Sequence, residues 1–244
     1  MDENKKDMND NDSLRLLVVV HKLAVHHNLI EGVWNHISFE STENKNHIIF
    51  TPGHTHWDLV SIKNLAKLDQ KGDLISGGKK PISAAWMIHK PIHAINPNYK
   101  CLIHLHSPYI TSMSINNHFE TRLTQHSSIF HNDVNYFDEY IENVDESDLG
   151  ELMAESMKEC RVLFLKNHGA LISGSTIAEA YMSTYMLERA CMFQLISSNH
   201  AKKFSLIPEK IVNKMKNNFF ENLCQKHFNG FVDFFNIKLF SSKE

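Results

Sequence analysis

The sequence predicts an α/β fold in which helices pack on both faces of a mixed sheet. Segments with the composition of β-strands alternate irregularly with segments of helical periodicity, and short polar turns join some strand segments into hairpins. With 244 residues, of which 42% are hydrophobic, the chain is long enough to bury one sizeable core. We therefore expect a single layered domain.

The N-terminal part begins with a helix and continues with short strands. Ser13 is a suitable N-cap for an amphipathic helix over residues 14–27. Residues 37–40 and 47–50 indicate a hairpin across a polar turn. The elements expected next are a strand or short helix at 59–68, a turn at 69–73 and a helix at 83–94.

The C-terminal part contains two strongly apolar strand segments, predicted at 101–106 and 161–166. Residues 121–144, between them, are polar and aromatic, and a solvated loop is the simplest interpretation. Three helices complete the prediction, at 148–158, at 175–200 and after Pro208, a residue that the first turn of a helix tolerates.

Each of the two apolar strands ends at a histidine. His104 and His106 are two residues apart, so both would point to the same face of a strand, and His168 follows the second strand. Three imidazoles from two strand ends would form a metal site with an open position, typical of catalytic zinc. The spacing alone is a weak signal, because the chain has 17 histidines and a second His-x-His pair at His54 and His56.

The bulk composition excludes several functional classes. A formal net charge of −3 gives no general reason to expect nucleic acid or an anionic membrane as a partner. The first dozen residues are polar and lack the apolar core of a signal peptide, and no segment approaches transmembrane length. The four cysteines show no Cys-x-x-Cys spacing, as expected of reduced thiols. We therefore expect a cytoplasmic protein.

Longer segments around the histidines carry a family resemblance, at residues 32–38, 88–107, 165–174 and 178–191. In order and spacing they resemble the class II aldolase/adducin family, closest to its adducin-head-like branch. The resemblance implies a three-layer α/β/α fold around a central mixed, mostly antiparallel sheet. It divides the chain into a disordered polar tail at 1–12, the family domain at 13–205 and a helical extension at 206–244 packed on the same domain.

The resemblance also implies a function. By this resemblance the chain would be a metal-dependent lyase acting on a small hydroxy-carbonyl compound. His104, His106 and His168 would hold a divalent metal, and zinc is the first candidate. The resemblance further implies a homotetramer with sites between subunits, a small-molecule substrate, and neither nucleic acid nor membrane as a partner. The alternative is a non-catalytic adducin-like head domain that acts through protein–protein contacts.

Two departures from the family pattern leave the reaction open between cleavage, epimerisation and dehydration. Family aldolases have an acidic residue where this chain has Ala85, which can neither bind metal nor accept a proton. The loops that bind phosphate in relatives are incomplete, so a phosphorylated substrate is not implied. The candidate catalytic residues are then Tyr136, Tyr140 and His89, and the candidate substrate-binding residues are Asn35, His36 and Ser83.

Overall fold

The computed structural model describes residues 10–138, 146–199 and 203–241. Its centre is an eight-stranded sheet in the order β4-β3-β2-β1-β5-β8-β7-β6. The strands are β1 His36–Glu40, β2 Ile48–Phe50, β3 Ala66–Leu68, β4 Leu74–Ser76, β5 Cys101–Leu105, β6 Val134–Phe137, β7 Val162–Leu165 and β8 Gly169–Gly174. All neighbouring strands pair antiparallel except β6 and β7. The predicted mixed, mostly antiparallel sheet is confirmed.

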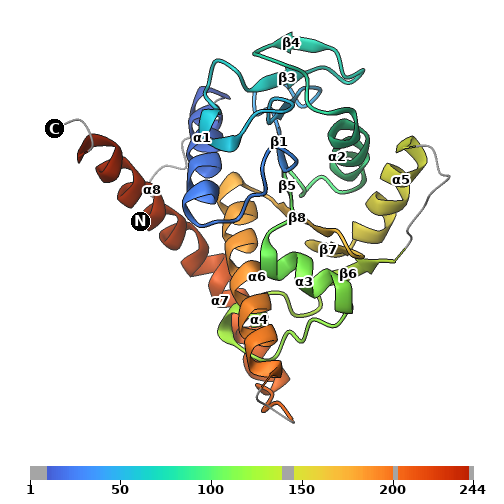
Figure 1. Cartoon of the computed structure of the whole chain (residues 1–244), viewed down its shortest axis with the longest axis vertical. Helices are drawn as coiled ribbons and strands as arrows, with labels where there is room; N and C mark the ends of the chain where they lie inside the picture. Colours follow the sequence, from blue (N-terminus) through green and yellow to red (C-terminus); the bar gives the residue numbers. More distant parts are fainter. Residues whose placement is uncertain (1–9, 139–145, 200–202, 242–244) are drawn as a thin grey trace.

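Helices cover both faces of this sheet, as Figure 1 shows. The larger core unites α1 Asp10–His26, α3 Pro108–Asn116, α6 Ile177–Ser198 and residues of α8 Cys224–Ser241 with one face. A second core places α2 Ser83–Ile95 and α5 Glu146–Met157 on the other face. The remaining helices are η1 Trp57–Leu59, α4 Gln125–Ser128, α7 Glu209–Asn218 and the π-helix η2 Phe219–Leu223. The architecture is therefore the predicted three-layer α/β/α sandwich.

Alternation along β5 decides which layer each side chain meets. Ile103 and Leu105 belong to the core under α1 and α6, whereas Leu102 belongs to the core under α2. Because successive side chains of a strand point to opposite faces, His104 lies on the α2 face with Leu102. This parity places the candidate metal ligand beside α2.

The N-terminal helix begins earlier than the sequence indicates. It starts at Asp10, and Ser13 is buried inside it instead of capping it. The Asp10 carboxylate accepts hydrogen bonds from Ser41, from Thr42 and from the Lys67 ammonium at 2.7 Å. The last three residues of the predicted tail at 1–12 are thus helical, and residues 1–9 lie outside the described residues.

Several other predicted boundaries also change. Only residues 66–68 of the segment at 59–68 form a strand, preceded by the short helix η1. The segment at 121–144, interpreted as a loop, contributes α4 and the edge strand β6. A further strand, β8, follows His168 at once. Periodicity missed β6 because a four-residue edge strand is half exposed and carries Asn135 and Tyr136.

The C-terminal helices pack against earlier helices of the chain. Helix α8 contacts α6 and α1, and α7 contacts α4. The Arg161 guanidinium lies 3.7 Å from the ring centre of Phe220 and pairs with Asp133, which also pairs with Lys216 of α7. Within the described ranges, no helix has both the length and the apolar character needed to cross a bilayer.

Candidate metal centre

The three predicted histidines converge in the structure. His104 is on β5, His106 lies one residue beyond that strand, and His168 is in the turn between β7 and β8. Their ring centroids are 4.6 to 5.0 Å apart, and one nitrogen from each ring lies within 4.8 Å of the others. Two strand ends that are adjacent in the sheet therefore bring the histidines together.

The turn that carries His168 depends on its neighbours. Asn167 adopts a left-handed conformation with φ of 55°, which asparagine tolerates better than most residues. A Cβ on Gly169 would lie 2.4 Å from the Leu105 carbonyl oxygen and 3.1 Å from the His106 ring. Glycine is therefore required for β8 to approach β5 closely at this point. The Asn-His-Gly sequence supplies both the bend and the clearance.

Hydrogen bonds fix the tautomers of two of these rings. The Nδ1–H of His104 donates to the Ala170 carbonyl, and the Nδ1–H of His106 donates to the Glu31 carboxylate, both at 3.1 Å. The Nε2 atoms of His104 and His106 are then unprotonated and lie 2.9 Å apart. Facing lone pairs repel, whereas a cation between them would be bound by both. This neutral nitrogen donor set fits a divalent metal of the zinc type.

Burial keeps the three imidazoles neutral at pH 7. It holds the pKa of His104 well below its usual value, with a further contribution from the neighbouring histidines. Burial and His106 lower the pKa of His168 to about 4. Burial also lowers the pKa of His106, partly opposed by Glu31. Neutral rings are the form that binds a metal.

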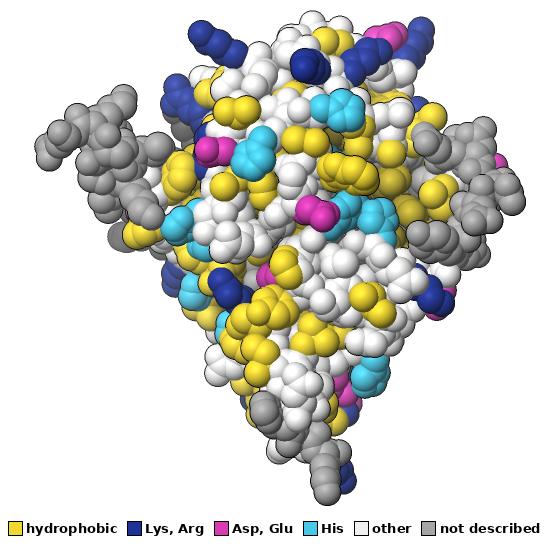
Figure 2. All heavy atoms as spheres, viewed as in Figure 1, with side chains coloured by type: hydrophobic (Ala, Val, Ile, Leu, Met, Phe, Trp, Pro, Cys, Tyr) yellow, Lys and Arg dark blue, Asp and Glu magenta, His cyan; other side chains and the backbone are white. Residues whose placement is uncertain are grey.

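Glu31 is a site residue that the sequence interpretation missed. Its carboxylate faces His106 although its side chain is 68% exposed. Its backbone N–H donates to the side-chain oxygen of Asn35 at 2.5 Å. Asn35 is buried, and its Nδ2 has no hydrogen-bond partner among the described residues. In Figure 2 an acidic side chain lies next to a pair of histidines on the visible face.

His36 and His89 lie behind the three histidines. His36 is directly opposite His104 across the β1–β5 pair, and the two ring centroids are 4.7 Å apart. His89 of α2 is fully buried, and its Nε2 lies 2.8 Å from Nδ1 of His36. The structure therefore brings both predicted residues to the site, with His36 between His89 and His104.

The α2 helix begins with the predicted residue Ser83, which is exposed. Gly53 approaches this end closely, with its N–H donating to the Lys80 carbonyl at 3.1 Å. Ala85 is fully buried in a small apolar cluster with Phe50 and Leu68. No carboxylate is present at the position where family aldolases have one.

The structure does not bring Tyr136 to the histidines. It is paired with Phe164 across β6 and β7 and packs in the core under α6, on the opposite face of the sheet from His104. Its hydroxyl accepts a hydrogen bond from the Phe119 N–H at 2.9 Å, a structural contact. Within one chain Tyr136 therefore lies away from the three histidines. The other predicted tyrosine, Tyr140, lies outside the described residues.

Glu188 is buried and supports the site. Its carboxylate accepts hydrogen bonds from the Ser107 hydroxyl at 2.6 Å and from the Ile110 N–H at 2.9 Å. These bonds satisfy donors at the N-terminus of α3. Because Ser107 directly follows His106, Glu188 anchors the chain next to a candidate metal ligand.

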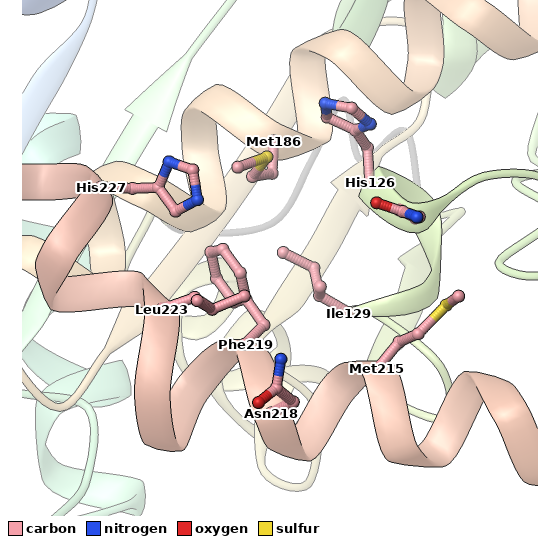
Figure 3. A pocket seen from close by; sticks show the side chains of 9 residues that line it. His126, Ile129, Met186, Met215, Asn218, Phe219, Leu223 and His227 are labelled. Carbon is pink, nitrogen blue, oxygen red and sulfur yellow. The ribbon is translucent and has the colours of Figure 1, made fainter.

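A hollow lies away from the three histidines, and none of them lines it. It has a volume of about 330 Å³ and is enclosed by α4, α6 and the C-terminal helices. Figure 3 shows His126 and His227 on opposite sides of it, with Met186, Ile129 and Phe219 between them. His126, one of the polar residues of the 121–144 segment, is therefore not at the metal centre.

The fold and the histidine site define a class II aldolase-type domain. The chain belongs to the family described as Class II Aldolase and Adducin N-terminal domain, whose model matches residues 15–195.

Among its relatives is a Caulobacter vibrioides protein named for aldolase class 2. It is 29% identical over 184 residues, which are 74% of this chain and 70% of that protein. Human beta-adducin is 25% identical over 169 residues, which are 68% of this chain but only 23% of that protein.

Solved structures share the fold over almost the whole chain. An L-fuculose 1-phosphate aldolase from Glaciozyma antarctica superposes with a TM-score of 0.80 at 24% identity, covering 96% of this chain and 94% of that one. An aldolase II superfamily protein from Pseudomonas syringae superposes with a TM-score of 0.83 at 21% identity, covering 92% of each chain. At these identities the likeness shows the fold alone.

Proposed function

We propose that this chain is a divalent-metal-dependent carbon–carbon lyase of the class II aldolase type, acting on a small, sugar-like hydroxy-carbonyl compound. The observation that carries the proposal is the convergence of His104, His106 and His168, two of them with Nε2 left free by bonds at Nδ1. Zinc is the ion that this neutral nitrogen set favours. His168 is exposed, so a substrate oxygen could reach an ion held there.

In such a cleavage, one substrate hydroxyl loses its proton and its oxygen becomes a carbonyl as the carbon–carbon bond breaks. The carbon released in the other fragment takes up a proton. A divalent ion at the three histidines would polarise the substrate carbonyl and hydroxyl oxygens. Glu31 holds the His106 ring in its ligating orientation through Nδ1.

The substrate contacts come from the side chains around the histidines. The Nδ2 of Asn35 is a buried donor without a partner among the described residues, and we assign it to a substrate oxygen. His36 lies beside His104, and Ser83 offers an exposed hydroxyl at the start of α2. His89 is hydrogen-bonded to His36 and would act through it. Tyr140 remains a candidate catalytic group. An unphosphorylated substrate agrees best with the incomplete phosphate loops.

We further propose a cytoplasmic homotetramer with sites between subunits, as the family resemblance implies. The competing function is an adducin-like head domain that works through protein contacts. Ala85, packed with Phe50 and Leu68 where an acidic residue is expected, favours that alternative. Under it, the metal would be retained without turnover.

A substrate screen with two variants separates these functions. The zinc-loaded protein is incubated with hydroxy-ketones, hydroxy-keto acids and L-fuculose 1-phosphate, and carbonyl products are detected by mass spectrometry. We expect turnover of at least one compound, lost in His106→Ala and kept in His118→Ala, which removes an exposed histidine elsewhere. No turnover of any compound by a metal-loaded, folded protein would favour the adducin-like function.

A further inference from the structure

A chain of buried hydrogen bonds runs from the metal centre into the interface between β1 and α2. The Nδ1 of His36 lies 2.8 Å from Nε2 of His89. The Nδ1 of His89 lies 2.6 Å from the hydroxyl of Ser38, which in turn lies 2.7 Å from Nε2 of His93. The chain ends where Nδ1 of His93 meets the Tyr99 carbonyl at 2.6 Å.

The residues of this chain share faces by simple periodicity. His36 and Ser38 are two residues apart on β1 and so point to the same side of the sheet. His89 and His93 are four residues apart on α2, one helical turn, and so face that side of the sheet together. All four side chains are at most 5% exposed. The arrangement therefore belongs to the packed interior.

The direction of every hydrogen bond in this series follows from the last acceptor, the Tyr99 carbonyl. A carbonyl oxygen only accepts, so Nδ1 of His93 carries the proton and its Nε2 accepts from Ser38. The single hydroxyl hydrogen of Ser38 is then used, so its oxygen accepts from Nδ1–H of His89. The Nε2 of His89 is left as an acceptor, and it takes the Nδ1–H of His36. Nε2 of His36 is consequently unprotonated.

This assignment requires neutral rings, and burial keeps them neutral. Burial lowers the pKa of His93 to about 4 and holds the pKa values of His36 and His89 well below their usual value. His89 and His93 lie on the side of α2 that also bears Ala85, one turn before His89. A network of neutral groups thus stands next to the place where family aldolases have an acidic side chain.

We propose that Ser38 and His93 are positioning residues that act through His89 to hold His36 as a hydrogen-bond acceptor for a substrate hydroxyl at the metal centre. The identity of the substrate rests on the proposed function, whereas the tautomer of His36 does not. Among the described residues, the side chains of Ser38 and His93 hydrogen-bond only to each other, to His89 and to the Tyr99 carbonyl. Their effect on the site is through the orientation of protons.

Imidazole ¹⁵N NMR of the full-length protein, labelled at histidine, directly tests the proton positions along this series of hydrogen bonds. A His36→Gln variant assigns the His36 signals. In the unsubstituted chain we expect Nδ1 of His36 to be protonated and Nε2 bare. In His93→Phe the Ser38 hydroxyl loses its acceptor and turns to donate to His89, so His36 should switch to the Nε2–H form. Ser38→Ala should give a mixture of the two forms.

A matched control is Ser183→Ala, which removes a buried hydroxyl with no partner among the described residues and should leave the His36 signals unchanged. An Nε2–H tautomer in the unsubstituted chain would overturn the proposal. An unchanged His36 tautomer in His93→Phe would do so as well. If Ser38→Ala does not fold, Ser38→Thr, which keeps the hydroxyl, should retain the original tautomer.

Binding of dihydroxyacetone to the zinc-loaded protein tests the link to substrate. Loss of one acceptor bond predicts about tenfold weaker binding in His93→Phe, with zinc affinity unchanged. Equal binding by both proteins would contradict the role of His36 as acceptor. No binding by the unsubstituted, zinc-loaded protein would count against the proposed function. The NMR result would still decide whether Ser38 and His93 set the tautomer of His36.

Discussion

Replacing Glu31 by glutamine should weaken metal binding about tenfold. The carboxylate accepts the Nδ1–H of His106 at 3.1 Å, which leaves Nε2 free for the metal. Removing such an outer carboxylate generally costs 10- to 100-fold in affinity. The low end applies here, because the Glu31 side chain is 68% exposed and glutamine keeps an acceptor oxygen. The expected loss is about 1.4 kcal/mol.

Competition with a chromophoric chelator measures this change in zinc affinity. The matched control is Glu209→Gln, because Glu209 is 65% exposed and lies 3.7 Å from the Nε2 of His131, away from the site. We expect the control to bind zinc as the unsubstituted chain does. Equal zinc affinity in Glu31→Gln would refute the assignment of Glu31 as the residue that orients His106.

Three further predictions concern stability. Gly150→Ala should lower the free energy of unfolding in urea by about 1–3 kcal/mol, because the new Cβ would lie 2.0 Å from the carbonyl oxygen of Met87. That carbonyl receives no bond within its own helix, because the residue four positions later is Pro91, which has no N–H. Gly230→Ala, with open space around it, should not destabilise. Stability should be full above pH 6.5 and fall as the pH drops towards 4, because burial lowers the pKa of His21 to about 4 and the unfolded chain takes up the proton first. His21 alone accounts for a loss of about 3 kcal/mol in the free energy of unfolding over this pH range. A urea midpoint that is constant between pH 7 and 4.5 would contradict this. Zinc at about 100 times its dissociation constant should raise the Tm by roughly 5–10 °C, and an unchanged Tm would argue against a bound ion.

The strong elements could be predicted from sequence because local pattern and tertiary environment agree there. Strands β5 and β7 are fully buried and therefore show continuous apolar runs, which also reveal where His104 and His168 stand. Strand β6 could not be recognised, because only Phe137 of its four residues is buried and Asn135 is exposed. Helix α1 begins at Asp10 through contacts with residues 41–43, which no local rule contains.

The clustering of the three histidines was predictable, but the residues that support them were not. His104, His106 and His168 stand in short motifs at strand ends, whereas Glu31 reaches His106 across 75 positions. Ser38 and His93 join only when β1 and α2 pack together. The position of Tyr136 on the other face of the sheet could not be predicted, because its sequence neighbourhood does not reveal which face it occupies. Residues that support a site are brought to it by tertiary contacts, so local sequence does not identify them.

Metal content tests the central claim most directly. The chain is purified without chelator or metal-affinity steps and analysed by plasma mass spectrometry, alongside His106→Ala and His118→Ala. The three-histidine site predicts about one equivalent of zinc or another divalent ion per chain, retained in His118→Ala and lost in His106→Ala. A folded chain that holds no divalent ion and takes up none from added zinc would contradict the account.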